Sequence, residues 1–208
     1  MAHYLIQFRF QGYAKQFLKQ TIYEVGKKFR VWGATKKKVV PHITLFGPFT
    51  TNDERKVVST FLAVSKKYHL MSFKLKGFDN FDNRVIFVDI TPSEELKRFR
   101  KELANELIKL RNFLIFKTIK TSGISDYEEH YPFHATIAFK DIQNKFRDIL
   151  HYLKNQKTPY IKQKILRITL LKNCRILYEY DFFQGRLLNR EEALGKFICR
   201  LPVTWRRS

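Results

Sequence analysis

The stretch Pro41-His42-Ile43-Thr44-Leu45 has a counterpart ninety-two residues later, His134-Ala135-Thr136-Ile137. Both stretches contain the tetrad His-x-Thr-[Leu/Ile], and the apolar residues in them are typical of a strand. Alternate residues of a strand point to the same face about 6.6 Å apart, so the His and Thr of each tetrad are expected to face the same way. One copy is a weak signal, but the duplication predicts two strands that act together.

The tetrads supply the groups that phosphodiester chemistry needs. The attacking oxygen must lose a proton and the leaving oxygen must gain one, on opposite sides of phosphorus, and two imidazoles can do both. We therefore expect His42 and His134 to be catalytic, with a bell-shaped pH profile. The hydroxyls of Thr44 and Thr136 are expected to bind the substrate phosphate.

Two other interpretations of these histidines remain open. For either tetrad alone, the alternative is an ordinary half-buried strand histidine with local hydrogen bonds. Metal ligation is the other alternative, but neither tetrad has a carboxylate or thiolate at a familiar ligand spacing. The sequence therefore predicts a site without a metal or a cofactor.

Hydrophobic periodicity predicts an α+β fold around the tetrads. Strand-like alternation is found in residues 3–10, 71–78, 85–90, 113–120, 133–139, 161–171 and 175–183, with a turn predicted at Lys172-Asn173. Helical spacing is found in residues 13–29, in two segments whose capping boxes start at Thr51 and Thr91, and from about Asp141 to Leu153. No linker-like composition divides the chain.

The order of these elements predicts one bilobal domain over residues 1–208. A strand and helix rhythm in about residues 1–90 recurs in about 91–208, so we expect two antiparallel-sheet lobes related by a pseudo-twofold axis. Helices are expected on the outside and the active cleft between the lobes. The whole inference requires that both tetrads reach this one cleft.

The charge of the chain points to an anionic partner. Its 40 Lys and Arg residues exceed its 19 Asp and Glu residues, which gives a net charge of +21. Nucleic acid, anionic lipid and phosphorylated metabolites all fit this charge. No apolar run of membrane length and no signal-peptide pattern is found, so we expect a cytoplasmic protein without a membrane segment. Cys174 and Cys199 are expected to be small buried side chains, and we expect a monomer without an obligate protein partner.

At the two tetrads the chain resembles the 2H phosphoesterase superfamily, in particular its branch of 2′-5′ RNA ligases and RNA 2′,3′-cyclic phosphodiesterases. The resemblance rests on residues 41–47 and 134–139, and the element order extends it over about residues 3–184. It implies metal-independent opening of RNA 2′,3′-cyclic phosphates to 2′-phosphates, with reversible 2′-5′ joining in some members. It also implies that His134 is the base that activates water and His42 the acid.

Further residues are candidates for RNA contact. Many relatives carry an arginine shortly after the second motif, where this chain has Phe139 and then Lys140, so Lys140 is a candidate phosphate ligand. The segment before the second tetrad contains rings that could stack on an unpaired base, and a lysine run precedes the first. The candidates from these two segments are Tyr127, Tyr131, Phe133 and Lys38.

Three functions therefore compete. The first is a cyclic phosphodiesterase that acts on RNA ends or small nucleotides with a cyclic phosphate. The second is a 3′-5′ exoribonuclease or a 2′-5′ oligonucleotide phosphodiesterase that uses the same histidines. The third is a non-catalytic nucleotide or RNA-binding module, which the retention of both complete tetrads disfavours.

Overall fold

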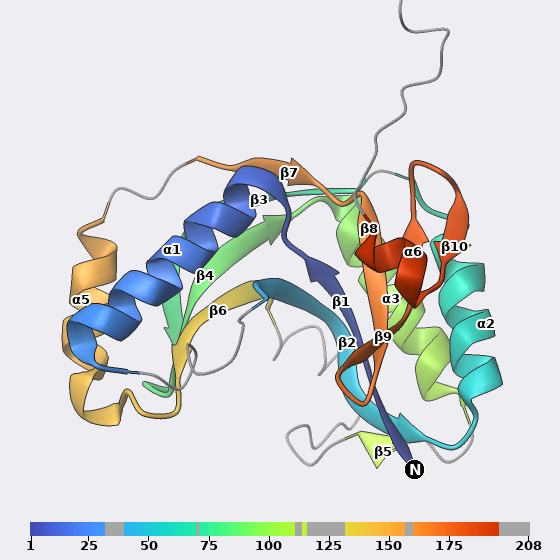
Figure 1. Ribbon diagram of the computed structural model, residues 1–208, viewed down its shortest axis with the longest axis horizontal. Helices are drawn as coiled ribbons and strands as arrows, with labels where there is room; N and C mark the ends of the chain where they lie inside the picture. Colours follow the sequence, from blue (N-terminus) through green and yellow to red (C-terminus); the bar gives the residue numbers. More distant parts are fainter. Residues whose placement is uncertain (32–39, 70, 111–113, 116–131, 157–159, 196–208) are drawn as a thin grey trace, which may run out of the picture.

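Two antiparallel sheets make up the frame of the protein (Figure 1). The computed structural model describes residues 1–31, 40–69, 71–110, 114–115, 132–156 and 160–195. The predicted α+β class and the two antiparallel-sheet lobes are confirmed. The predicted strand 113–120 is described only at β5 (Leu114–Ile115).

The larger sheet has six strands in the order β10-β9-β8-β1-β2-β5. Its strands are β1 (Ala2–Arg9), β2 (His42–Thr51), β5, β8 (Arg167–Lys172), β9 (Arg175–Asp181) and β10 (Arg186–Leu188). The strand β2, which carries the first tetrad, pairs with β1 so that His42 lies opposite Arg9 and Thr44 opposite Gln7.

The smaller sheet has four strands in the order β6-β4-β3-β7. Its strands are β3 (Ser72–Phe81), β4 (Val85–Pro92), β6 (His134–Phe139) and β7 (Lys162–Lys164). The second tetrad starts the edge strand β6, in which His134 lies opposite Asp89 of β4.

The two lobes do not coincide with the two halves of the sequence. The larger sheet combines β1 and β2 with β5, β8, β9 and β10, while the smaller sheet combines β3 and β4 with β6 and β7. Each sheet thus draws strands from both sides of residue 90. Sequence periodicity identifies strands but not their partners, because pairing is set by register over long separations.

Helices cover the outer sides of the sheets (Figure 1). Helix α1 (Gly12–Phe29) contacts β6 and α5 (Phe146–Lys154) contacts β3, while α2 (Glu54–Ser65) packs beside α3 (Glu94–Ile108), which contacts β2. The 3₁₀ turn η1 (Gln143–Lys145) precedes α5, and the short α6 (Arg190–Leu194) contacts β9. None of these described helices is both long and apolar enough to cross a membrane.

Three predicted helix starts were placed too early. Thr51 ends β2 and Asp53 is the N-cap of α2, since its carboxylate accepts a hydrogen bond from the Lys56 amide at 3.1 Å. Thr91 lies in β4, and Ser93 is the N-cap of α3. In both places sheet pairing extends the strand through the residue that local propensity offers as a cap. The helix expected from about Asp141 begins only at Phe146.

One hydrophobic core joins the two sheets. Phe73 of β3 packs edge-on against Phe8 of β1, with ring centroids 5.3 Å apart, and against Phe10, with centroids 5.6 Å apart. All three rings are almost fully buried, so each contributes strongly to the hydrophobic free energy of folding. The relative position of the two tetrads is therefore fixed by side chains packed in the core.

The turn between β8 and β9 differs from both predictions made for this segment. Its two turn residues are Asn173 and Cys174 rather than Lys172 and Asn173, and Cys174 is exposed rather than buried. Both residues have positive φ angles, 47° for Asn173 and 62° for Cys174. A two-residue hairpin favours this backbone, for which Asn-Gly is the preferred pair. Cys199 lies outside the described residues.

Replacing Cys174 by glycine should stabilise the fold. A left-handed backbone costs a residue with a Cβ atom roughly 1–2 kcal/mol, part of which is offset by the larger unfolded-state entropy of glycine. We expect Cys174→Gly to raise the free energy of unfolding by about 0.5–1 kcal/mol in urea denaturation. Cys174→Ser, which keeps the Cβ atom, should give no such gain. An equal gain in both variants would contradict this explanation.

Candidate active site

Each tetrad begins a strand, with its histidine as the first residue. His42 starts β2 and His134 starts β6. In both strands the His and Thr of the tetrad are half-buried, while the residues that follow each of them are fully buried. The predicted alternation is therefore found: each His and Thr pair shares the more open face, and the apolar residues of the tetrad enter the core.

Both imidazoles are held by a backbone carbonyl group two residues earlier. His42 Nδ1 lies 3.0 Å from the Val40 carbonyl oxygen, and His134 Nδ1 lies 2.8 Å from the Pro132 carbonyl oxygen. A carbonyl oxygen can only accept a hydrogen bond, so Nδ1 must carry the proton in both rings. In the neutral ring Nε2 is then the basic nitrogen, and both histidines have the tautomer that a proton carrier at Nε2 requires.

The two tetrads lie close enough to influence each other. Strands β2 and β6 are in contact although they belong to different sheets, and Figure 1 shows them meeting between the lobes. The positive charge of His42 acts on His134 and lowers the pKa of that ring. Two imidazoles and two threonines thus come from two sheets to the same region of the molecule.

Burial is the main cause that lowers the pKa of His134. The ring lies against Phe81 and Phe87, with centroid distances of 5.0 and 5.2 Å. The hydrogen bond to the Pro132 carbonyl opposes this effect, while the charges of His42 and Arg100 lower the pKa further. His134 therefore favours the neutral form, which can accept a proton.

Arg100 is a residue near this site that the sequence analysis missed. It is 4% exposed on α3, and its guanidinium carbon lies 3.9 Å from the centroid of the Phe133 ring. A signal was present: Arg100 occupies the stripe of α3 that otherwise carries Leu96, Phe99, Leu103 and Leu107. A charged side chain is rarely fully buried unless other groups interact with it.

Polar side chains continue across the larger sheet beside the first tetrad. Arg9, opposite His42, donates hydrogen bonds to Thr169 at 3.1 Å and to the Glu179 carboxylate at 2.7 Å. Thr169 also donates to Glu179 at 2.6 Å, and both of these residues are fully buried. Residues opposite one another share a face of a sheet, so this network lies on the same face as His42. It fixes the strand that neighbours the first tetrad.

The structure corrects one of the predicted RNA contacts. Phe133 is 5% exposed and belongs to the core, where the Arg100 guanidinium lies over its ring, so a base cannot stack on it. Lys140 follows the end of β6, about 20 Å along the strand from His134, so a contact between Lys140 and RNA would involve a phosphate other than the reacting one and stays a prediction. Tyr127, Tyr131 and Lys38 lie outside the described residues.

Among the residues that the structure describes, no three His, Cys, Asp or Glu side chains are grouped so that they could hold a metal ion.

The chain has a clear counterpart among protein families. The model of the 2′-5′ RNA ligase superfamily matches residues 29–175, which include both tetrads. No curated protein matches the chain by sequence.

Solved structures resemble the chain at low sequence identity. TT0787 of Thermus thermophilus is 14% identical with a TM-score of 0.58, over 86% of this chain and 97% of that one. LigT of Escherichia coli complexed with 3′-AMP is 13% identical with a TM-score of 0.44, over 90% of this chain and 92% of that one. Usb1 of Kluyveromyces marxianus with uridine monophosphate is 13% identical with a TM-score of 0.47, over 84% of this chain and 96% of that one. The likeness to TT0787 confirms the fold.

The electrostatic link between the histidines can be measured directly. We expect an NMR titration of the imidazole signals to give His134 a pKa below the usual 6.5. The His42→Gln variant, which removes one positive charge, should raise the pKa of His134 relative to wild type. A pKa of His134 at or above 6.5, or a pKa that is the same in the wild type and in His42→Gln, would contradict the proposal that the two rings share a site.

Proposed function

The chain belongs to the 2′-5′ RNA ligase superfamily of 2H phosphoesterases, whose members act on RNA, and from this premise we propose that it is an RNA 2′,3′-cyclic phosphodiesterase. The proposed reaction opens the cyclic phosphate to a 2′-phosphate without a metal ion. The observation that carries the proposal is the pair of carbonyl-bound imidazoles, His42 and His134, placed on strands that meet between the two sheets.

We assign the role of general base to His134. Its lowered pKa keeps Nε2 unprotonated near neutral pH, so this nitrogen can take a proton from a water molecule as the water oxygen attacks phosphorus. Protonated His42 then gives its Nε2 proton to the 3′-oxygen as the bond between phosphorus and that oxygen breaks. The product carries a 2′-phosphate and a 3′-hydroxyl group, and the protons balance between the two rings.

The threonines are proposed to hold the phosphate between the rings. Thr44 and Thr136 lie two residues after their histidines on the same strand faces, about 6.6 Å away. Each hydroxyl group can donate one hydrogen bond to a non-bridging oxygen. Donors fixed by strand geometry before the substrate binds also stabilise the charge that develops in the transition state. Joining of RNA ends through a 2′-5′ linkage would use the same groups in the same roles, with a 5′-hydroxyl group in place of water: His134 takes its proton and His42 protonates the departing 3′-oxygen.

Removing either imidazole should nearly abolish turnover. On a short RNA with a 2′,3′-cyclic phosphate end, assayed in EDTA, we expect His42→Ala and His134→Ala each to lower kcat by about 10²- to 10⁴-fold. Thr44→Ala and Thr136→Ala should have smaller effects, since each removes one hydrogen bond. The mass of the product shows the addition of one water molecule, and comparison with authentic 2′-phosphate and 3′-phosphate standards by chromatography checks that the 2′-phosphate forms.

The competing functions give different results in this assay. Stepwise shortening of the RNA would instead support an exoribonuclease, and cleavage of 2′-5′ linked oligonucleotides alone would support that phosphodiesterase. RNA binding without turnover would support a binding module. His151→Ala, at an exposed position on α5, is the matched histidine control and should leave kcat unchanged.

The pH dependence should report both histidines. The base must be neutral and the acid protonated, so kcat/KM should follow a bell-shaped curve. Because the pKa of His134 is lowered, the midpoint of the acidic limb should lie below pH 6.5. A profile that rises or falls steadily through neutral pH would contradict the two-histidine mechanism.

A further inference from the structure

One face of the smaller sheet carries a row of lysines that begins beside the second tetrad. Within β4, alternate residues Phe87, Asp89 and Thr91 share a face, and Asp89 lies opposite His134. Thr91 in turn lies opposite Lys74 of β3, and Lys74 lies opposite Lys162 of β7. Because residues opposite one another in a ladder share a face, Lys74 and Lys162 lie on the same face as His134.

Two further lysines belong to this row. Lys76 Nζ lies 3.9 Å from the Asp89 carboxylate, which places it on the same face, and Lys164 lies two residues after Lys162 in β7. All four side chains are exposed. We refer to Lys74, Lys76, Lys162 and Lys164 as the lysine track.

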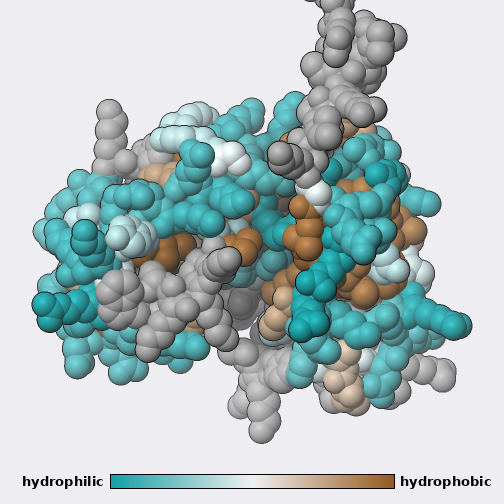
Figure 2. Space-filling view, in the orientation of Figure 1, coloured by the Kyte–Doolittle hydropathy of each residue, from teal (hydrophilic) through white to brown (hydrophobic). Residues whose placement is uncertain are grey.

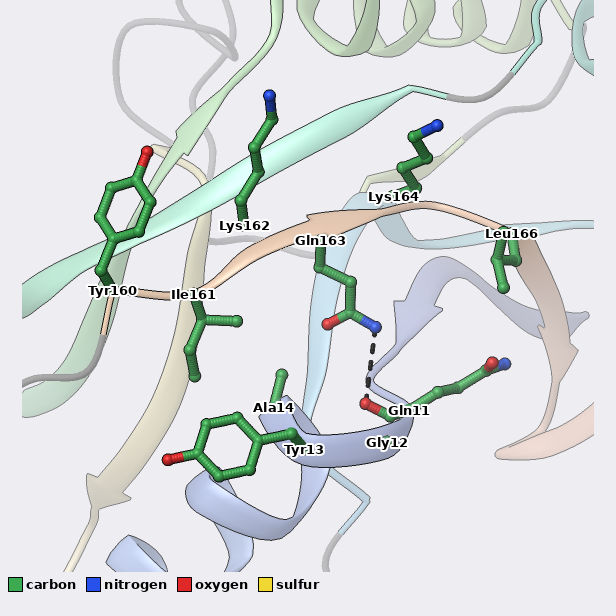
Figure 3. Close-up of a pocket in the computed structure, with 10 residues that line it drawn as sticks. All are labelled: Gln11, Gly12, Tyr13, Ala14, Tyr160, Ile161, Lys162, Gln163, Lys164 and Leu166. Atoms are coloured by element: carbon green, nitrogen blue, oxygen red, sulfur yellow. Dashed lines mark hydrogen bonds between the residues drawn. The ribbon is translucent and has the colours of Figure 1, made fainter.

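An exposed aromatic ring lies at the outer end of the lysine track. Tyr160 is 75% exposed, and Lys74 Nζ lies 5.7 Å from the centroid of its ring. Figure 3 shows Tyr160, Lys162 and Lys164 pointing to one side of β7, while Ile161 and Gln163 point toward α1 on the other side. A large exposed ring beside ammonium groups has no role in the packing of the core.

The opposite side of β7 provides a natural comparison. A cavity of about 590 Å³ between the β7 segment and the start of α1 is lined from both, by Tyr160, Lys162 and Lys164 as well as by Tyr13 of α1, which is 65% exposed. Figure 3 shows Tyr13 and Ala14 below the strand in this view, across from the lysine side chains. Tyr13 therefore matches Tyr160 in type and exposure and lines the same cavity, but its ring lies on the side of β7 away from the lysine side chains.

The acidic residues of this face lie toward its inner part. Asp89 is opposite His134 and within reach of Lys76, and Asp79 lies opposite Phe87 on β3. The part of the track on β7 carries lysines at both of its outward positions, Lys162 and Lys164. Positive charge on this face thus increases with distance from the second tetrad.

We propose that the lysine track and Tyr160 bind the single-stranded RNA that precedes the reacting nucleotide, an inference that rests on the proposed function. Three strand spacings separate β6 from β7, about 14 Å, a span that one nucleotide does not fill. Alternating ammonium groups and an exposed ring match the alternating phosphates and bases of such a strand. Figure 2 shows mostly hydrophilic side chains on the viewed face of the molecule, with hydrophobic ones near its middle. The substrate is accordingly an RNA end of several nucleotides rather than a free cyclic mononucleotide.

Substrate length tests the proposal through the split between KM and kcat. With wild-type protein, KM should fall from a cyclic mononucleotide to a cyclic-phosphate tetranucleotide while kcat changes little. Tyr160→Ala and the double variant Lys74→Ala/Lys162→Ala should raise KM for the tetranucleotide at least fivefold and leave the mononucleotide unaffected. Tyr13→Ala and Lys19→Ala, the matched controls on α1, should behave as wild type.

A binding measurement separates this inference from the proposed function. Fluorescence anisotropy with a labelled hexanucleotide that ends in a 2′-phosphate requires no turnover. Tyr160→Ala should raise Kd roughly five- to fiftyfold and Tyr160→Phe should restore it, since stacking needs only the ring. Each lysine removed should reduce the slope of log Kd against log salt by about 0.7.

The outcomes are distinct. Absence of turnover on every substrate, together with Tyr160-dependent binding, would overturn the proposed function but support the track. Turnover together with a Kd for RNA that is unchanged in the Tyr160 and lysine variants would overturn only the proposed role of the lysine track. An equal loss of RNA affinity in Tyr13→Ala would also overturn it. So would variants that lose affinity for a poly-glutamate peptide but keep their affinity for RNA.

Discussion

Two hydrogen bonds, from the Nδ1 of each histidine to the carbonyl oxygen two residues before it, are the interactions on which the proposed chemistry depends. Each bond forms where the chain enters a strand, so strand geometry and side-chain orientation are fixed together. With Nδ1 committed to a carbonyl, Nε2 becomes the nitrogen that exchanges protons in both rings. Burial against Phe81 and Phe87 then lowers the pKa of His134, so this ring favours the neutral form.

The interleaving of the two sheets gives this pair a rigid frame. Each sheet contains strands from both halves of the chain, and Phe8, Phe10 and Phe73 pack across the junction. On one side of the site, Arg9 ties β1 to the buried Glu179 two strands away. Neither tetrad can shift without disturbing a packed core, and two-histidine chemistry requires that kind of fixed separation.

The sequence predicted what local periodicity encodes. The shared face of His and Thr in each tetrad follows from the two-residue period of a strand, and most elements were located correctly. Thr51 and Thr91 were misassigned as helix caps because sheet pairing, which is not local, overrides a capping propensity. The lysine track was missed for the same reason, since only the register of distant strands brings its members onto one face. Arg100 had a local signal in the apolar stripe of α3, but only the packing of α3 brings it near the second tetrad.

The central claim is that His42 and His134 flank a single phosphorus atom. A crystal structure of the protein with a uridine and vanadate, which adopts the five-coordinate geometry of phosphoryl transfer, tests it most directly. The account predicts one vanadium atom with the two Nε2 atoms on its opposite apical sides and the Thr44 and Thr136 hydroxyl groups on its equatorial oxygens. Vanadate bound to only one imidazole, or bound elsewhere while the two rings face apart, would contradict it.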